Sequence, residues 1–159
     1  MRYHHEATAE RYLRQYGIEA YLPVQKVHRQ YTDRTVVVLA PLFPCYIFVK
    51  VSYREYHKAL QDRSIAGYVK FEGFPAPVTD ETIKTIRRIL EMEVGIEVTD
   101  EEFHPGDQVL IDGGPLSGLE AEVVERWGKK ELILRVEGTS NSIVITLPCD
   151  YLLANKKPV

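Results

Sequence analysis

The segment from Ala40 to Val49 constrains the fold of this chain more than any other stretch. Its sequence, Ala-Pro-Leu-Phe-Pro-Cys-Tyr-Ile-Phe-Val, brackets a Leu-Phe pair with two prolines and continues directly into an apolar, aromatic run. Proline fixes φ and lacks the N–H that a helix interior or a central strand needs, so the prolines predict a kinked entry. The run Tyr46–Val51 has high β propensity and predicts a central, buried strand.

Helical and strand periodicities alternate over the first 92 residues. Ala9, Leu13 and Tyr16 share one helical face that ends at Gly17, and Thr79 can cap a second helix. This order predicts helices packed on an antiparallel sheet. The predicted elements are a helix over 6–16, a strand over 18–22, a hairpin of 24–30 and 35–39, a strand over 46–51, a short polar helix over 54–60, a strand over 68–71 and a helix over 79–92.

The C-terminal third has a different pattern: short predicted strands at even spacing, with glycine-containing turns between them. Four or five such strands in about 50 residues predict a small closed or half-closed barrel. The predicted fold class is therefore α+β, with an α/β sandwich at 1–92, an acidic linker at 93–102 and the barrel at 103–155. The predicted barrel strands cover 109–111, 120–126, 131–137 and 142–147.

Charge is distributed unevenly between the two predicted halves. Residues 1–94 carry 14 Lys/Arg against 11 Asp/Glu, a net of +3, whereas residues 95–159 carry 6 against 12, a net of −6. The basic half favours a local nucleic-acid contact, and the acidic half favours docking on protein. The excess in the first half is small, so ordinary solvated surface remains an alternative explanation.

Several functional classes find no support in the sequence. No apolar run approaches the roughly 20 residues that cross a bilayer, and no secretory leader precedes the first helix. Cys45 and Cys149 are too few for a disulfide scaffold and are expected to be reduced, buried thiols. The pair His4-His5 lacks further ligands at metal-binding spacing. No nucleophile, phosphate-binding or Cys-x-x-Cys motif occurs, so we expect neither an enzyme nor a cofactor.

Four motifs are informative through their order and spacing: Gly17–Pro23, Pro41–Val49, Pro77–Glu81 and the run Gly106-Asp107-Gln108-Val109 with Gly114-Pro115 and Gly118. Taken together, they resemble the NusG family of transcription factors over nearly the whole chain, and the fourth resembles the family's KOW signature. The resemblance implies a NusG N-terminal (NGN) domain followed by an SH3-like KOW β-barrel. In the KOW signature the glycines serve as turn residues. The family's first strand, a Trp-Tyr-hydrophobic run, is missing before the helix, which we interpret as a late start or a truncation.

The family resemblance implies a cytoplasmic transcription elongation or antitermination factor that binds RNA polymerase and suppresses pausing or termination. The short hairpin at 24–39 is similar to specialised paralogues that serve capsular-polysaccharide operons. Residues 138–143 replace the Phe-Gly-Arg-x-Thr stretch of the housekeeping form. That departure weakens the expectation that the family's contacts with termination factor Rho and with a ribosomal protein are made here. A ribosomal protein or other factor is still a candidate partner of the KOW domain.

Site residues follow from the same resemblance. The clamp helices of the polymerase largest subunit would bind an apolar depression, of which alternation along the strands exposes two or three members. A polar loop, Ser52–Lys58, would touch the opposite side of the polymerase cleft, and Arg or Lys of the first helix would hold non-template DNA, with Tyr12 or Tyr16 available to stack a base. The polymerase-binding candidates are Phe43, Tyr46, Phe48, Tyr68, Phe71, Arg54 and His57, and the DNA-binding candidates are Arg11, Arg14, Gln15 and Arg63.

A function of another class also fits the C-terminal motif. KOW barrels occur in ribosomal proteins, so the chain could be an RNA- or ribosome-binding module of the translation machinery. Such proteins are usually strongly basic, whereas residues 95–159 carry a net charge of −6. The acidic balance favours docking on protein over wrapping RNA.

Overall fold

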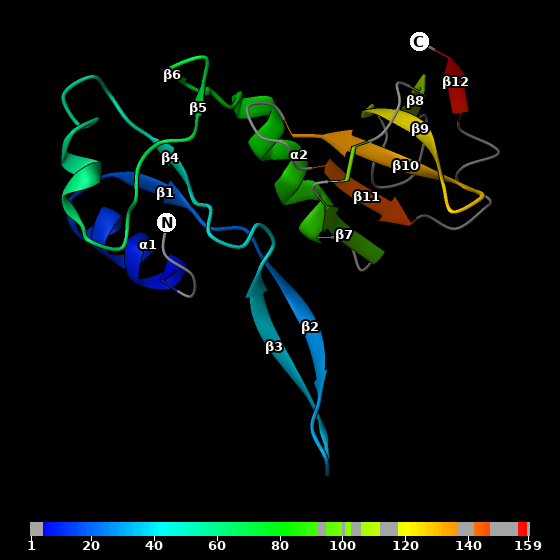
Figure 1. Ribbon diagram of the computed structural model, residues 1–159, viewed down its shortest axis with the longest axis horizontal. Coiled ribbons are helices and arrows are strands. Elements are labelled where there is room, and N and C mark those ends of the chain that lie inside the picture. The colour runs from blue at the N-terminus through cyan, green and yellow to red at the C-terminus, as the bar shows by residue number, and fades with distance from the viewer. Residues whose placement is uncertain are drawn as a thin grey trace. The chain divides into compact units, whose positions relative to one another are not determined.

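Helix α1 (Glu6–Gln15) is the first helix of the computed structural model shown in Figure 1. The structure describes residues 5–91, 95–99, 101–102, 106–111, 118–136, 142–146 and 156–158. Two compact units divide the chain, one formed by residues 1–68 and the other by residues 69–159. Helices and antiparallel strands both occur, in agreement with the predicted α+β class.

The core of the first unit lies between α1 and a two-stranded sheet. Gly17, at φ +73°, reverses the chain after α1 in a backbone region that glycine adopts without strain. Strand β1 (Glu19–Tyr21) then pairs antiparallel with β4 (Phe48–Lys50). The predicted central strand over 46–51 is therefore shorter, and in the described residues it pairs with β1 alone. The buried members of this core are Leu13, Ile18, Ala20 and Ala59, against which Tyr12, Ile47, Val49, Val51, Ile65 and Tyr68 pack.

The predicted hairpin is confirmed. Strands β2 (Val24–Gln30) and β3 (Thr35–Pro41) pair antiparallel, with Val27 opposite Val38, and project as a ribbon away from α1 and β1 (Figure 1). None of residues 24–41 is buried. The ribbon is therefore stabilised by its own ladder and cross-strand pairs and not by a hydrophobic core.

The second unit begins with a small hairpin and a helix. Strands β5 (Lys70–Phe71) and β6 (Phe74–Pro75) pair antiparallel, and the predicted second helix is α2 (Asp80–Glu91). Thr79 caps α2 as predicted, because its Oγ1 accepts a hydrogen bond from the N–H of Thr82 at 3.2 Å. The apolar stripe of α2 buries Ile86 and Ile89.

A six-stranded antiparallel sheet forms the rest of the second unit. Its strand order is β12-β8-β9-β10-β11-β7, so β12 and β7 stand at its two ends and the described ladder does not close into a barrel. Alternating side chains bury Val124, Ile133 and Val144 together. The six strands are β7 (Gly95–Thr99), β8 (Asp107–Ile111), β9 (Glu120–Arg126), β10 (Lys129–Arg135), β11 (Ser142–Thr146) and β12 (Lys156–Pro158).

The acidic segment 93–102, which the sequence predicted to be a linker, contains a strand of this sheet. Ile96 and Val98 stand opposite Ile145 and Ile143 of β11. The alternation of apolar and polar residues in Gly-Ile-Glu-Val-Thr is a strand pattern that the high acidic content obscured. A domain boundary in this region stays a prediction, and the division into compact units falls earlier, between residues 68 and 69.

Gly106, the first residue of the KOW signature, is required by close packing. A Cβ at this position would lie 1.9 Å from the carbonyl oxygen of Val123. The N–H of Gly106 donates to Glu122 Oε1 at 2.7 Å, and Arg135 Nε donates to the other carboxylate oxygen at 2.8 Å. The glycine thus brings the start of β8 against β9, whereas Gly114-Pro115 lies outside the described residues.

Candidate nucleic-acid and polymerase interface

Helix α1 and the short 3-10 helix η1 (Lys58–Gln61) are joined through two tyrosines and a lysine. The rings of Tyr12 and Tyr16 lie 4.6 Å apart, and Lys58 Nζ lies 5.5 Å from the Tyr16 ring centroid. Lys58 Nζ also donates to the Tyr16 carbonyl at 3.2 Å, and the Tyr12 hydroxyl donates to the Lys58 carbonyl at 3.4 Å. These contacts hold the end of α1 against the start of η1, which lies over 40 residues further along the chain.

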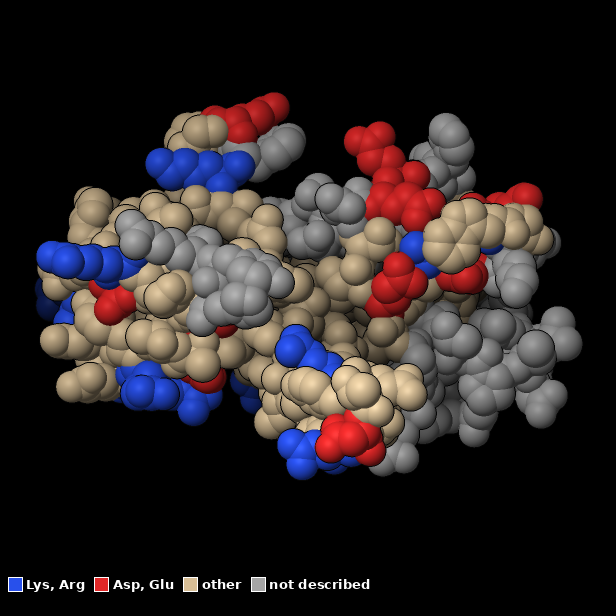
Figure 2. Space-filling model, turned by 60° about the horizontal axis from the view of Figure 1, so that its bottom comes forward, with Lys and Arg blue, Asp and Glu red and all other residues tan. Residues whose placement is uncertain are grey.

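The four predicted DNA-binding residues are all exposed in the first unit. Arg11, Arg14 and Gln15 lie on α1, and Arg63 follows η1. Arg14 forms an ion pair with Glu10 at 2.7 Å but keeps most of its side chain in solvent. Figure 2 shows several Lys and Arg side chains on the surface of the first unit. We call residues Arg11, Arg14, Gln15, Tyr16 and Lys58 the α1–η1 face.

The loop that was expected to touch the polymerase is hydrogen-bonded near both of its ends. Ser52 donates from its N–H and its hydroxyl to Glu55 Oε2, at 2.8 and 2.7 Å, and these bonds lower the pKa of the Glu55 carboxyl. At the other end, the Tyr68 hydroxyl donates to the Tyr56 carbonyl at 2.9 Å, and the two rings stack at 4.2 Å. Burial raises the pKa of Tyr68, so it remains a neutral donor.

The same loop presents its polar and aromatic side chains to solvent. The expected helix over 54–60 is instead a series of turns that leads into η1. Arg54 and His57 are exposed, and the His57 ring stands edge-on to Tyr56 at 5.2 Å. Tyr53 is 95% exposed and was missed, although an aromatic residue beside Arg54 in a Ser-x-x-Glu turn is a recognisable signal of a presented side chain.

The predicted apolar depression is only partly assembled at the surface. Phe43 is 2% exposed and meets Phe48 edge-on at 5.6 Å, so it is a core residue and not a contact residue. Phe48 is half-buried and stacks on Tyr21 at 6.4 Å, while Tyr46 is exposed. Phe71 lies in β5, and its side chain is outside the described part of the chain.

For Cys45 the expected free thiol is present, but the expected burial is wrong. Cys45 is a free thiol and is half-buried, at φ +69° in the turn after Pro44. The proline at 44 and the tight turn keep this residue at the edge of the core. Cys149 lies outside the described residues.

The described residues contain no group of three or more His, Cys, Asp or Glu that could hold a metal ion. None of the helices described is both long enough and apolar enough to cross a membrane. The α1–η1 face and the loop 52–57 present exposed cations and exposed aromatic rings.

Comparison with known protein families agrees with this arrangement of a capped helix, a strand and a Pro-Leu-Phe-Pro turn. Residues 1–87 match the family described as NusG, transcription termination factor nusG. The matched segment is more than half of the 159 residues, and the chain belongs to the NusG family. NusG-family proteins are transcription termination and elongation factors, so this chain interacts with the transcription machinery.

Proposed function

We propose that this protein binds elongating RNA polymerase through residues 1–92 and suppresses pausing or termination. The observation that carries the proposal is the joining of the loop 52–57 to helix α1 through Lys58, Tyr16 and Tyr12. Arg54 and His57, proposed for the polymerase, and Arg11, Arg14 and Gln15, proposed for DNA, thereby lie on segments that are hydrogen-bonded to each other. A factor that uses both can bridge protein and nucleic acid in a single encounter.

The proposed mechanism is a shift of population and not a chemical step. A factor that contacts both sides of the polymerase cleft binds the closed, elongating state better than the opened, paused one. It can move that equilibrium only by its differential affinity, and about 1.4 kcal/mol changes the populations tenfold. In this proposal the clamp helices meet Tyr46 and Phe48, and Tyr53, Arg54 and His57 meet the opposite side.

The α1–η1 face would hold the displaced DNA strand. Guanidinium groups of Arg11, Arg14 and Arg63 suit phosphate oxygens, and the half-exposed ring of Tyr16 offers a stacking surface for a base. Phosphate contacts of this kind release counterions, so the DNA contribution should weaken steeply as salt rises. The low excess of positive charge agrees with an auxiliary contact that requires the polymerase.

A reconstituted elongation assay with the cognate polymerase tests this function. The chain should shorten pauses or reduce release at a terminator, and Arg11→Ala/Arg14→Ala should lose the DNA-dependent part of recruitment while keeping polymerase binding. Arg29→Ala/Arg34→Ala removes two positive charges from the β2–β3 ribbon and is the matched control. Unchanged pausing on the protein's own operon leader would refute the antitermination role.

For residues 103–155, within the second unit, we propose the KOW assignment with an SH3-like barrel fold. Support comes from the close packing at Gly106 and from the positive φ of Gly118, both within the signature. We further propose that the protein is a specialised paralogue serving a surface-polysaccharide operon and acts in the cytoplasm. Deletion in the native host should then lower transcription of distal genes of one long operon and leave other operons unchanged.

A further inference from the structure

The turn between β9 and β10 places a large aromatic residue where small ones are favoured. Trp127 and Gly128 both have positive φ, 51° and 73°, and Arg126 pairs with Lys129 across the turn. Two-residue hairpin turns of this kind favour Asn, Asp and Gly, and a bulky residue there carries backbone strain. Trp127 is nevertheless 80% exposed, so neither turn formation nor burial in a core accounts for a tryptophan.

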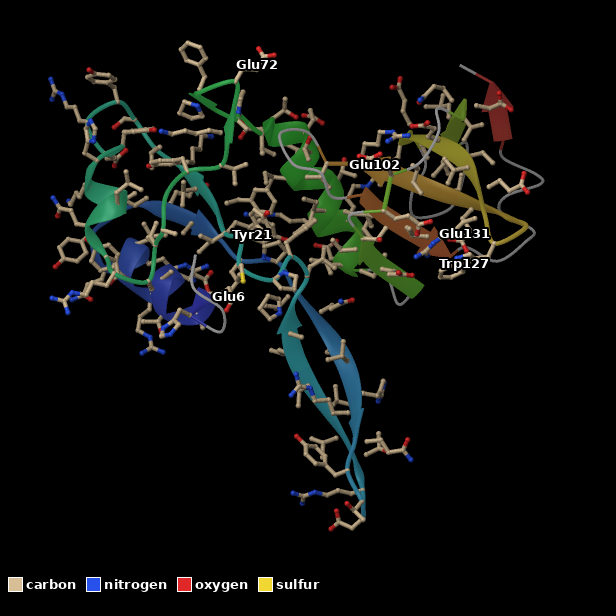
Figure 3. All side chains as sticks on the ribbon, viewed as in Figure 1. Glu6, Tyr21, Glu72, Glu102, Trp127 and Glu131 are labelled. Carbon is tan, nitrogen blue, oxygen red and sulfur yellow. The ribbon has the colours of Figure 1, made fainter. Side chains whose placement is uncertain are left out.

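The orientation of the Trp127 ring is fixed from one side. The Arg126 guanidinium lies 4.0 Å from the ring centroid, although Arg126 itself is only 5% exposed. Arg126 donates to both carboxylate oxygens of Glu97 at 2.9 Å and to Glu101 at 2.9 Å, and it lies 3.8 Å from Glu131. One ring face therefore rests on an anchored cation, and the remainder of the ring is open to solvent (Figure 3).

Among the described side chains, those that lie against Arg126 behind the ring are acidic, and their charge exceeds that of Arg126. Three carboxylates, those of Glu97, Glu101 and Glu131, face one guanidinium, which leaves two negative charges. Hydrogen bonds from Arg126 lower the pKa of Glu97, so this carboxyl is ionised at neutral pH. The wider segment 95–159 carries 6 Lys/Arg against 12 Asp/Glu. An anion is thus disfavoured at this surface and a cation is favoured.

We propose that Trp127, with Glu97, Glu101 and Glu131, forms a docking site for a basic segment of a partner protein. An Arg or Lys side chain of the partner would lie on the open face of the Trp127 ring, because the face of an indole attracts cations. The flanking carboxylates would accept its N–H groups. Tryptophan and arginine are the residues that most often dominate protein–protein affinity. The proposal concerns the second unit and does not depend on polymerase binding by the first.

Trp127 is the only tryptophan of the chain, so its fluorescence reports directly on this site. The full chain is titrated with an acetylated 12-residue peptide of alternating Arg and Gly, and in parallel with the matching Glu-Gly peptide and with single-stranded dT12. We expect a saturable change of emission with the Arg peptide alone, and an apparent Kd that rises with salt. Absence of a saturable change, or tighter binding of dT12, would overturn the proposal.

Variants at Trp127 and Glu131 distinguish binding at this site from a general attraction of the peptide to the acidic surface. Trp127→Asn removes the ring and is suited to the left-handed backbone, so it should fold and lose at least tenfold in affinity measured by calorimetry. Glu131→Gln should lose several-fold in affinity measured by fluorescence. Glu120→Gln makes the same charge change at an exposed position of β9 and should bind like the wild type. Equal affinity of Trp127→Asn and wild type would reject the site. If that variant does not fold, equal weakening by Glu131→Gln and Glu120→Gln would reject it.

Discussion

The carboxylate of Glu6 accepts a hydrogen bond from the backbone N–H of Cys45, 39 residues further along the chain, at 2.8 Å. Glu6 is 5% exposed and lies in the first turn of α1 (Figure 3). Cys45 holds a left-handed backbone directly after Pro44. One buried carboxylate therefore fixes the turn from which the aromatic strand β4 departs.

Replacing Glu6 by Ala should destabilise the first unit by about 1–3 kcal/mol, since the partly buried Cys45 N–H would lose its acceptor. Urea unfolding followed by circular dichroism measures the change. Glu10→Ala is the control, because it removes an ion pair with exposed Arg14 that is worth at most about 1 kcal/mol. Similar unfolding midpoints for the two variants would contradict this role of Glu6.

Gly106→Ala should unfold or strongly destabilise the sheet of the second unit. Its Cβ would lie 1.9 Å from the Val123 carbonyl oxygen, so β8 and β9 would have to move apart. We expect a loss of about 3 kcal/mol or more, at the upper end of overpacking effects. Gly128→Ala is the comparison, because it has positive φ but open space and should lose only about 1–2 kcal/mol. Thermal melts of both variants measure the two losses of stability. A smaller loss for Gly106→Ala than for Gly128→Ala would contradict the close packing at Gly106.

The second unit should lose stability in acid through Glu122. Hydrogen bonds from Arg135 first, and from the Gly106 N–H, lower the pKa of the buried Glu122 carboxyl. Because the folded pKa is below the unfolded value of about 4.3, the stabilisation is complete above that value and is lost as pH falls through the folded pKa. Tm measured from pH 6 to pH 3 should fall less steeply for Glu122→Gln than for wild type or Glu120→Gln. Parallel curves would show that Glu122 does not contribute.

Tyr68→Phe should loosen the loop 52–57 without disturbing the stacked rings. The variant keeps the ring that lies 4.2 Å from Tyr56 but removes the donor to the Tyr56 carbonyl. We expect a loss of about 1 kcal/mol in stability and weaker polymerase binding. Tyr31→Phe removes a hydroxyl from a side chain of the β2–β3 ribbon that is 52% exposed, and it should leave stability and polymerase binding unchanged. Chemical denaturation and polymerase pull-down distinguish the two variants, and identical behaviour would argue against a positioning role for Tyr68.

Local periodicity predicted most elements because their signals are short-range. The helix over 6–16 and the hairpin after Pro23 are present within two residues of their expected bounds. The strand at Gly95–Thr99 was missed because its partner, β11, lies more than 40 residues away and its glutamates were interpreted as linker composition. Strand β12 has no periodic signal in its three residues, Lys-Lys-Pro, and only pairing with β8 defines it.

The candidate site was harder to predict, since exposure depends on packing that a sequence does not show. Phe43 and Phe48 have similar sequence context, yet only the first is fully buried. Arg11, Arg14 and Arg63 were predicted to be available because charged side chains seldom bury, and they are exposed. The link of Tyr12 and Tyr16 to Lys58 spans over 40 residues and could not be read from spacing.

The length of the β2–β3 ribbon can change with little effect on the stability of the rest of the first unit. Because none of residues 24–41 is buried, insertion of residue pairs near Asp33 would extend the ribbon without opening a cavity. Each added pair would advance its tip by roughly 3.4 Å, the rise of an antiparallel strand. Relatives of this protein could therefore evolve different spans on an unchanged scaffold, and an engineer could graft a tag there with little effect on folding.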